Sequence, residues 1–343
     1  MDIFMETKMS NKSYSPFKRA AGLASAIALG MAIYSPSYAL NKVRVGSTVS
    51  PDADAVALCL AIDNGAFTKA GLDVQLQTFA QSNLKYDADK SGEQDIDINM
   101  GAINAAQLYS SGVPVVVLRA GTPADLWAVI ARKDSKFTKP SDFRGQKYGV
   151  VSLSGVNYGA TYLAFETDGV NLAKDVKVST LPPSALVPAL VKGEIAGATT
   201  FEPFLTAALK TGSVKVLFRP GAVYEQKYHH PLIALTIATN KNYLKNHRED
   251  VKKFMRVVEA TRSTLAQHSA EAAVALVHHM PEAKMNVAAA KKLIDEYLPN
   301  AIKSENTPKF VGGVQQLYDQ LLEAKQLKSP VKASDFWIDW TRL

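Results

Sequence analysis

Four short segments of the chain bring together hydroxyl, amide and glycine residues, which suits the binding of a small polar molecule. Hydroxyl and amide groups supply hydrogen-bond donors, and small side chains let backbone N–H groups approach a ligand. Such a set fits a sulfonate, carboxylate, nitrate or polarised carbonyl group. The segments are GSTVSPD from Gly46, NMGAIN from Asn99, SLSGVN from Ser152 and ATTFEP from Ala198.

Each segment follows a short apolar run and precedes a helical pattern, so we expect four turns that lead from a strand into a helix. The N-terminus of a helix offers unpaired N–H groups and the positive end of the helix dipole. We therefore predict that these turns bind a ligand. Their candidate residues are Ser47, Thr48, Asn99, Gly101, Ala102, Ser152, Ser154, Gly155, Asn157, Thr200, Phe201 and Glu202.

Helix capping is the alternative role for these side chains, because Ser and Asn are preferred N-cap residues. For SLSGVN the residues alone leave capping and ligand binding open. Two alternative roles are also open for Glu202. It can stabilise the positive start of a helix, or it can pair with a ligand amine or ring N–H.

Two aromatic residues and one basic residue are further candidates. Trp127 and Tyr224 are predicted to bind ligand, because aromatic rings can stack on or enclose a small molecule. The alternative for both is core packing. Arg119 is the best-placed cation for an anionic head group, and its alternative role is a salt bridge.

Catalytic and metal chemistry lack the neighbours that they require. SLSGVN does not match the G-x-S-x-G pattern of a nucleophilic serine, and the phosphate-binding pattern G-x-x-x-x-G-K-[ST] is absent. The histidine pairs 229–230 and 278–279 have no Glu or Cys at a recognised spacing. Cys59, the only cysteine, lies in an apolar pattern typical of a core residue. We therefore predict no catalytic residues, no metal and no cofactor.

The N-terminus has the pattern of a secretory signal peptide. Basic residues between Lys12 and Arg19 precede an apolar run over residues 20–33, and SYA ends at Ala39. The run is 14 residues long, whereas a membrane span needs about 20. We predict cleavage after Ala39 and a periplasmic protein, with Met9 as a second possible start.

Length and charge set the broad class of the protein. The chain has 343 residues, 47% of them hydrophobic, which favours two domains with ordinary cores. The formal net charge is +7, but Lys and Arg are scattered and no basic cluster is flanked by aromatic residues. Nucleic-acid binding is therefore not expected.

The elements that must position the turns follow from the pattern of the mature chain. Short strands and helices alternate, which predicts α/β units with a mostly parallel sheet. Residues 91–118 and 192–218 share one layout of Gly-Glu, strand, turn, helix and Val-rich strand, so two lobes on one plan are expected. The apolar runs 126–134 and 230–239 are candidate connecting strands, and helices dominate after Lys241.

The sequence resembles the solute-binding proteins of ABC importers, in the group that includes binders of sulfonates, taurine, nitrate and thiamine precursors. The resemblance spans about residues 42–240, and one departure is Ala196, where that group usually has an acidic residue. Its landmarks are AIDNGAFTKAGLDV from Ala61, the segment 91–118, KPSDFRGQKYGVVSLSG from Lys139 and ALVKGEIAGATTFEPF from Ala189.

The resemblance implies a type II periplasmic binding fold, in which two α/β lobes are joined by two connecting strands and hold ligand in a cleft. The lobes are expected to be residues 40–130 plus 231–343 and residues 131–230. It further implies a non-enzymatic monomer whose closed form docks on a membrane permease with its ATPase. A sulfonate, a taurine-like compound or a related carboxylate is the expected ligand. Two alternatives stay open: an enzyme on this fold that acts on a thiamine-precursor-like or aromatic molecule, and a ligand-sensing receptor.

Overall fold

The computed structural model describes residues 39–343, apart from residues 50, 154–155, 203, 297 and 299–307. The predicted signal peptide therefore lies outside the described residues, except for Ala39. None of the described helices combines the length and the apolar character that crossing a membrane demands.

The first sheet has five strands in the order β2-β1-β3-β10-β4. All run parallel except β10, which is antiparallel to both of its neighbours. The carboxyl ends of β1 and β3 therefore lie at the same edge of the sheet. The strands are β1 (Asn41–Thr48), β2 (Leu72–Phe79), β3 (Ile96–Gly101), β4 (Val115–Pro123) and β10 (Ile233–Asn240).

The second sheet repeats the plan of the first, with the order β7-β6-β8-β5-β9 and a single antiparallel strand, β5. The order β3-α4-β4 in the first sheet matches the order β8-α8-β9 in the second. These two units lie in residues 91–118 and 192–218, the stretches whose sequences share one pattern. The predicted α/β fold with two similar sheets is confirmed. The strands are β5 (Trp127–Arg132), β6 (Lys147–Val150), β7 (Lys177–Thr180), β8 (Gly197–Phe201) and β9 (Val214–Phe218).

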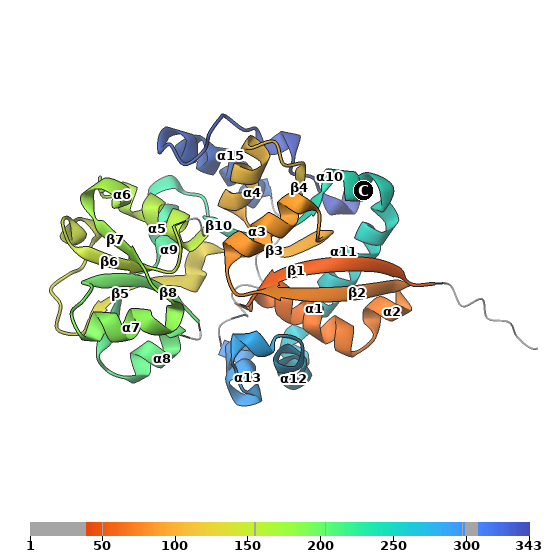
Figure 1. The fold of residues 1–343 in the computed structure, drawn as a ribbon, viewed down its shortest axis with the longest axis horizontal. Coiled ribbons are helices and arrows are strands. Elements are labelled where there is room, and N and C mark those ends of the chain that lie inside the picture. The colour runs from red at the N-terminus through yellow and green to blue at the C-terminus, as the bar shows by residue number, and fades with distance from the viewer. Residues whose placement is uncertain (1–38, 50, 154–155, 203, 297, 299–307) are drawn as a thin grey trace, which may run out of the picture. The chain divides into compact units, whose positions relative to one another are not determined.

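Helices cover both faces of each sheet, as an α/β fold requires. In Figure 1, α5, α6 and α9 lie on one face of the second sheet, with α7 and α8 on the other. The helices up to the return strand are α1 (Ala53–Asp63), α2 (Ala66–Lys69), α3 (Ser82–Ser91), α4 (Ala102–Ser110), α5 (Val156–Glu166), α6 (Leu172–Asp175), α7 (Pro183–Val191), α8 (Phe204–Lys210) and α9 (Pro220–Tyr228).

The chain after the return strand is helical, as its pattern predicts. Its helices are α10 (Lys241–Asn246), α11 (Arg248–Ser263), α12 (Ser269–His279), α13 (Val287–Glu296) and α15 (Pro308–Glu323). Short 3₁₀ turns are η1 (Ala124–Leu126), η2 (Pro140–Phe143), η3 (Leu265–Gln267), η4 (Pro281–Ala283), η5 (Ala333–Asp335) and η6 (Trp340–Arg342).

Helix α1 is buried on all sides, which explains why its sequence is apolar without a polar stripe. It starts at Asp52, whose Oδ1 accepts a hydrogen bond from the Ala55 N–H at 2.8 Å. Residues 53–61 are all buried, and α1 packs against α11 and α12 as well as the sheet. The C-terminal helices therefore complete the core of the first sheet.

The chain passes between the sheets twice, and the two crossings lie side by side. It leaves β4 through η1 into β5, and it returns through α9 into β10. The Ala124 N–H donates to the Leu232 carbonyl at 2.7 Å where the crossings meet. The two predicted connecting strands are thus β5, by which the chain enters the second sheet, and β10, by which it returns to the first. The residue numbers that bound the lobes stay a prediction.

The C-terminal segment pairs with the outer edge of β4 at Val117. The Val117 N–H donates to the Phe336 carbonyl at 2.7 Å, and the Ile338 N–H donates to the Val117 carbonyl at 2.9 Å. Phe336 is buried against Tyr109 and Tyr318. An uncovered strand edge invites pairing with another chain, so this segment protects the sheet.

Candidate functional site

The turns after β1 and β3 are joined by one amide, that of Asn99. Its Oδ1 accepts a hydrogen bond from the Thr48 N–H at 3.1 Å, and its Nδ2 donates to the hydroxyls of Ser47 at 3.0 Å and Thr48 at 3.3 Å. Asn99 and Ser47 are buried. Three of the sequence-predicted site residues are therefore in direct contact, because β1 and β3 are neighbouring parallel strands.

Lys85 of α3 holds Asn99 in place from the other side. Its ammonium donates to the Asn99 Oδ1 at 2.8 Å, the Asn99 carbonyl at 2.8 Å and the Asp97 Oδ1 at 2.7 Å. The Lys85 side chain is fully buried, and an ammonium has three donors. All three are used internally, so Lys85 orients the turn and has no donor left for a ligand.

The turns after β3 and β6 meet at two glycines. A Cβ placed on Gly101 would lie 3.0 Å from the Val156 Cβ, and one on Gly159 would lie 2.5 Å from the Ile103 Cδ1. Gly101 is the N-cap residue of α4, and Val156 starts α5. The start of α4 therefore packs directly on the start of α5, with buried Ala102 beside it.

The turns after β6 and β8 are joined by buried hydroxyls. The hydroxyl of Thr199 lies 2.8 Å from that of Thr161 and 2.7 Å from that of Tyr148. Thr161 also donates to the Asn157 carbonyl at 2.7 Å. Contacts among the described residues thus connect all four strand-to-helix segments in series, two from each sheet.

Within the turn after β6, Asn157 makes a local contact in the first turn of α5. Asn157 is buried, and its Oδ1 accepts a hydrogen bond from the Tyr158 N–H at 2.8 Å. Ser152 is half-buried. Ser154 and Gly155, two predicted ligand-binding residues, lie outside the described residues.

In the turn after β8, Glu202 contacts the helix that follows it. Its Oε2 accepts a hydrogen bond from the Thr206 N–H at 3.1 Å, which is the helix-stabilising role considered for it. The buried Thr200 hydroxyl has no hydrogen-bond partner among the described residues. Phe201 is half-buried and packs edge-on against Phe204.

The two aromatic candidates lie in the core that the sheets share. Trp127 pairs with Phe201 between β5 and β8 and is buried. Tyr224 is fully buried on α9, and its hydroxyl donates to the Gln320 Oε1 at 2.6 Å. Burial raises the pKa of the Tyr224 hydroxyl. The structure brings Trp127 to the turn after β8, whereas Tyr224 contacts Gln320 of α15 and Tyr228 of its own helix.

Arg119 of β4 is held in a buried ion-pair cluster, its alternative role in the sequence analysis. It pairs with Asp54 and, at 2.7 Å, with Glu259, and Asp54 also faces the Arg262 Nε at 3.3 Å. Arg119 is 3% exposed, so its charge is balanced by carboxylates of the protein. The buried cations Lys85 and Arg119 are both neutralised internally, which leaves hydroxyl, amide and N–H groups as the donors that the turns carry.

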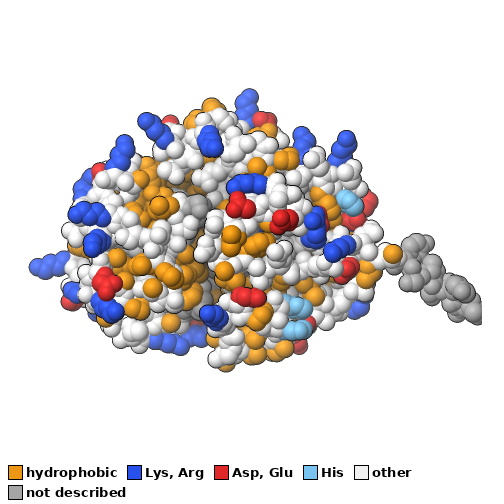
Figure 2. Space-filling view, in the orientation of Figure 1, with side chains coloured by type: hydrophobic (Ala, Val, Ile, Leu, Met, Phe, Trp, Pro, Cys, Tyr) orange, Lys and Arg blue, Asp and Glu red, His pale blue; other side chains and the backbone are white. Residues whose placement is uncertain are grey.

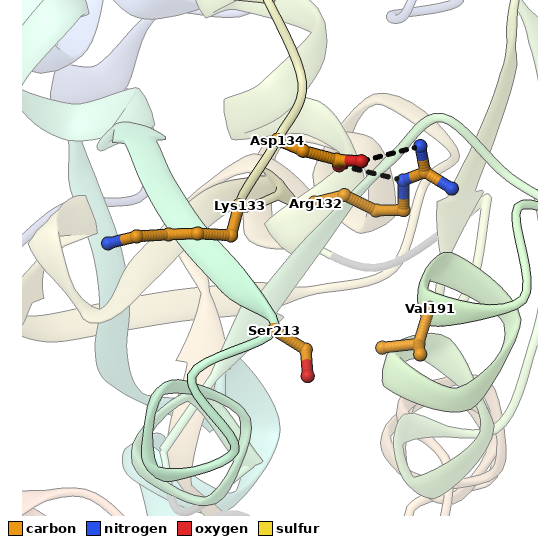
Figure 3. A pocket seen from close by; sticks show the side chains of 5 residues that line it. All are labelled: Arg132, Lys133, Asp134, Val191 and Ser213. Carbon is orange, nitrogen blue, oxygen red and sulfur yellow. Dashed lines mark hydrogen bonds and ion pairs between the residues drawn. The ribbon is translucent and has the colours of Figure 1, made fainter.

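A separate surface hollow of about 340 Å³ lies at the opposite edge of the second sheet (Figure 3). β5 ends there at Arg132, and Ala131 pairs with Gly197, the first residue of β8. Arg132 and Asp134 point toward each other and form an ion pair at 3.1 Å. Its charged lining residues are exposed, so the hollow has no buried polar group that would mark a binding site.

Cys59 is fully buried, and burial raises the pKa of its thiol to about 12. A thiol with such a pKa stays protonated near neutral pH and is therefore a poor nucleophile. On the face shown in Figure 2, Lys and Arg side chains stand singly or in small groups, interspersed with Asp and Glu.

Sequence reasoning missed Lys85 and Asp97, although the strand carries a signal for them. In IDINMG every residue is buried, and Asp97 and Asn99 alternate with apolar residues. Two polar side chains on one face of a buried strand require partners. The partner of both side chains is Lys85, which lies in the polar helix α3. The sequence of this helix does not indicate that a lysine in it is buried.

Comparison with known families and relatives gives two sequence matches. The profile of a family described as NMT1/THI5 like matches residues 52–272. A relative from Haemophilus influenzae named "Putative thiamine biosynthesis protein" is 25% identical over 258 residues, which cover 74% of this chain and 78% of the relative.

Solved structures give a likeness in fold. The periplasmic aliphatic sulphonate binding protein SsuA from Escherichia coli superposes with a TM-score of 0.70 at 14% identity, covering 88% of this chain and 98% of that one. The alkanesulfonate-binding protein SsuA from Xanthomonas axonopodis pv. citri, bound to MOPS, has a TM-score of 0.69 at 13% identity, with 87% and 98% covered.

Proposed function

Because this chain belongs to the NMT1/THI5 like family, we propose that it is the substrate-binding component of an ABC-type importer. In this proposal it is exported to the periplasm, captures a small organic anion or zwitterion, and delivers it to a membrane permease with its ATPase. The likeness in fold to the sulphonate binding protein of Escherichia coli supports the same reading.

The observation that carries the proposal is the series of contacts that joins four strand-to-helix turns. Two turns come from each sheet, and they meet through Asn99, Gly101 and Thr199. In open α/β sheets, ligands bind beyond the carboxyl ends of the strands. A ligand held by turns of both sheets favours the arrangement in which they approach each other, which gives capture by closure.

The chemistry of the turns favours a sulfonate or taurine-like ligand. A sulfonate oxygen accepts hydrogen bonds from N–H and hydroxyl groups, which the turns offer at the Thr48 hydroxyl and at the starts of α4 and α5. The buried Ser47 hydroxyl donates to the Thr48 carbonyl at 3.0 Å and therefore supports the turn. With Lys85 and Arg119 neutralised internally, the site binds the anion by dipoles and donors. The names of both SsuA proteins support this class of ligand.

An enzyme of the thiamine pathway is the second candidate, favoured by the name of the Haemophilus relative. Covalent or thiolate chemistry gains no support from Cys59, the only cysteine, because it is buried and its thiol has a raised pKa. A 4-aminopyrimidine is therefore best tested as a bound ligand alongside the sulfonates.

The experiment is native mass spectrometry of the purified protein, followed by calorimetric titration with taurine, ethanesulfonate and a 4-aminopyrimidine. We expect a sulfonate to bind at one site per chain. Asn157→Ala is expected to weaken it by about tenfold, the value of one lost hydrogen bond of ~1.4 kcal/mol.

Asn171→Ala is the matched control, because Asn171 is likewise an asparagine at the start of a helix that packs on the second sheet, where it caps α6 by accepting a hydrogen bond from the Lys174 N–H. It is expected to leave the affinity unchanged. If no small molecule is carried by the protein and none of the three probes binds, the transport proposal fails. Preferential binding and turnover of the pyrimidine would instead favour the enzyme.

A further inference from the structure

Three metal-ligating side chains converge where two helices end. Asp63 is the last residue of α1, and His278 and His279 are the last two of α12. The Asp63 Oδ1 lies 3.2 Å from the His278 Nδ1 and 2.9 Å from the His279 Nε2. We propose that these three residues bind a divalent transition-metal cation of the Zn²⁺ type.

The spacing of the three ligand atoms fits one shared ion. Zn²⁺ takes imidazole nitrogen and carboxylate oxygen at 2.0–2.2 Å in a tetrahedron, so neighbouring ligand atoms lie about 3.4 Å apart. Both distances from the Asp63 oxygen are close to that value, and all three atoms lie within 4.8 Å of one another. Small side-chain shifts therefore suffice to seat the ion.

The remaining coordination position would face solvent. The side chain of His278 is 68% exposed and that of Asp63 is 36% exposed. Water can complete the tetrahedron, and the ion can enter without any opening of the fold. The exposure predicts a site that exchanges its metal, in contrast to a closed structural site whose four ligands all come from protein.

The backbone adds a second electrostatic contribution that favours a cation. α1 and α12 both present their C-terminal ends at the cluster. A helix C-terminus carries the negative end of the helix dipole and unpaired carbonyl groups, which stabilise nearby positive charge. Two such ends and one carboxylate surround the place where the ion would lie.

The consequence of binding is a clamp between distant parts of the chain. Asp63 and the histidines are separated by more than 200 residues, and α1 is the buried helix that leads away from the first turn of the site. A metal that joins α1 to α12 ties the C-terminal helices to the first sheet. This explains why the sequence pattern alone predicts no metal there: the third ligand is distant along the chain.

The test is calorimetric titration of EDTA-treated protein with ZnCl₂ at neutral pH, together with thermal unfolding. We expect one Zn²⁺ per chain and a rise of roughly 2–5 °C in the unfolding midpoint at saturation. His279→Ala and Asp63→Asn are each expected to weaken binding by at least about tenfold, since even outer partners of a metal are worth that much.

His268→Ala is the matched control, because His268 is an exposed histidine just before α12 that lies 4.0 Å from Glu271. It is expected to keep the wild-type affinity. The visible spectrum with Co²⁺ gives an independent readout, with intense tetrahedral bands lost in His279→Ala. The proposal is overturned if wild-type protein binds no Zn²⁺, or if folded His279→Ala and Asp63→Asn proteins bind it as wild type does.

Discussion

At the scale of single residues, Asp52 determines how the stability of the first sheet depends on pH. Its Oδ1 caps α1, while its Oδ2 is buried with no hydrogen-bond partner among the described residues. Burial, followed by repulsion from Asp54, raises the pKa of the Asp52 carboxyl to about 7, opposed by the Ala55 N–H, Arg262 and Lys85. The folded protein therefore retains a proton that the unfolded chain releases near pH 4.

A carboxyl with a raised pKa stabilises the fold most at low pH. Its contribution falls once the unfolded chain ionises near pH 4, and it is lost as pH rises through about 7. Between pH 5 and 8, we expect Asp52 to cost wild type about 2–3 kcal/mol of unfolding free energy. Asp52→Asn removes this loss, so the unfolding free energy of the variant rises relative to that of wild type as pH rises. Urea unfolding of both proteins at pH 5 and 8 measures it.

Asp142→Asn is the control for this pH effect. Asp142 is half-buried, and hydrogen bonds from the Thr138 and Lys139 N–H groups lower the pKa of its carboxyl. The contribution of Asp142 to the free energy of unfolding is therefore fully present above pH 5. From pH 5 to 8 the unfolding free energy of Asp142→Asn should differ from that of wild type by a constant amount. A constant difference for Asp52→Asn as well would show that Asp52 is ionised in the fold.

At the scale of elements, the contact between α4 and α5 depends on a glycine. Gly159 lies in the interior of α5, where Ala would be favoured by about 1 kcal/mol. Its missing Cβ makes room for the Ile103 Cδ1, which would lie 2.5 Å away. Gly159→Ala alone is expected to destabilise the protein, because overpacking costs about 1–3 kcal/mol.

Ile103→Val provides the partner change, because it removes the Cδ1 and leaves the nearest Ile103 carbons 3.5 and 3.7 Å from the new Cβ. In that background Gly159→Ala should become stabilising. A double-mutant cycle from urea unfolding is expected to show a coupling of about 1 kcal/mol or more. Additive effects would mean that the two helices do not pack through this pair.

Local patterns predict the elements well and their long-range partners poorly. Alternation of strands, small-residue turns and helices fixes both sheets, because it depends on neighbours in sequence. Asn99 could be placed at a strand end in this way. Lys85 could not, because the burial of a charged side chain depends on Asp97 and on packing that no local pattern encodes. The contact between Asp63 and His278 could not be predicted for the same reason.

At the scale of the whole molecule, the C-terminal segment determines whether the first sheet has an open edge. Phe336 and Ile338 hydrogen-bond with Val117 of β4, and the Trp337 indole N–H donates to the Tyr318 hydroxyl at 2.9 Å. Removal of residues 334–343 would expose that edge and empty the place of buried Phe336. Loss of a buried Phe costs about 3–5 kcal/mol, so we expect a large fall in the urea midpoint.

The exposed edge is also expected to change the state of association. Unpaired N–H and C=O groups on β4 would pair with another copy, so sedimentation velocity should show dimers or larger species of the truncated chain. Removal of residues 340–343 alone leaves the contacts of Val117 intact and is expected to leave the state of association as it is in wild type. If the longer truncation has the state of association and the stability of wild type, the segment neither protects the edge nor supports the core. If neither truncation changes the state of association and only the longer one loses stability, the C-terminal segment supports the core and does not protect the edge.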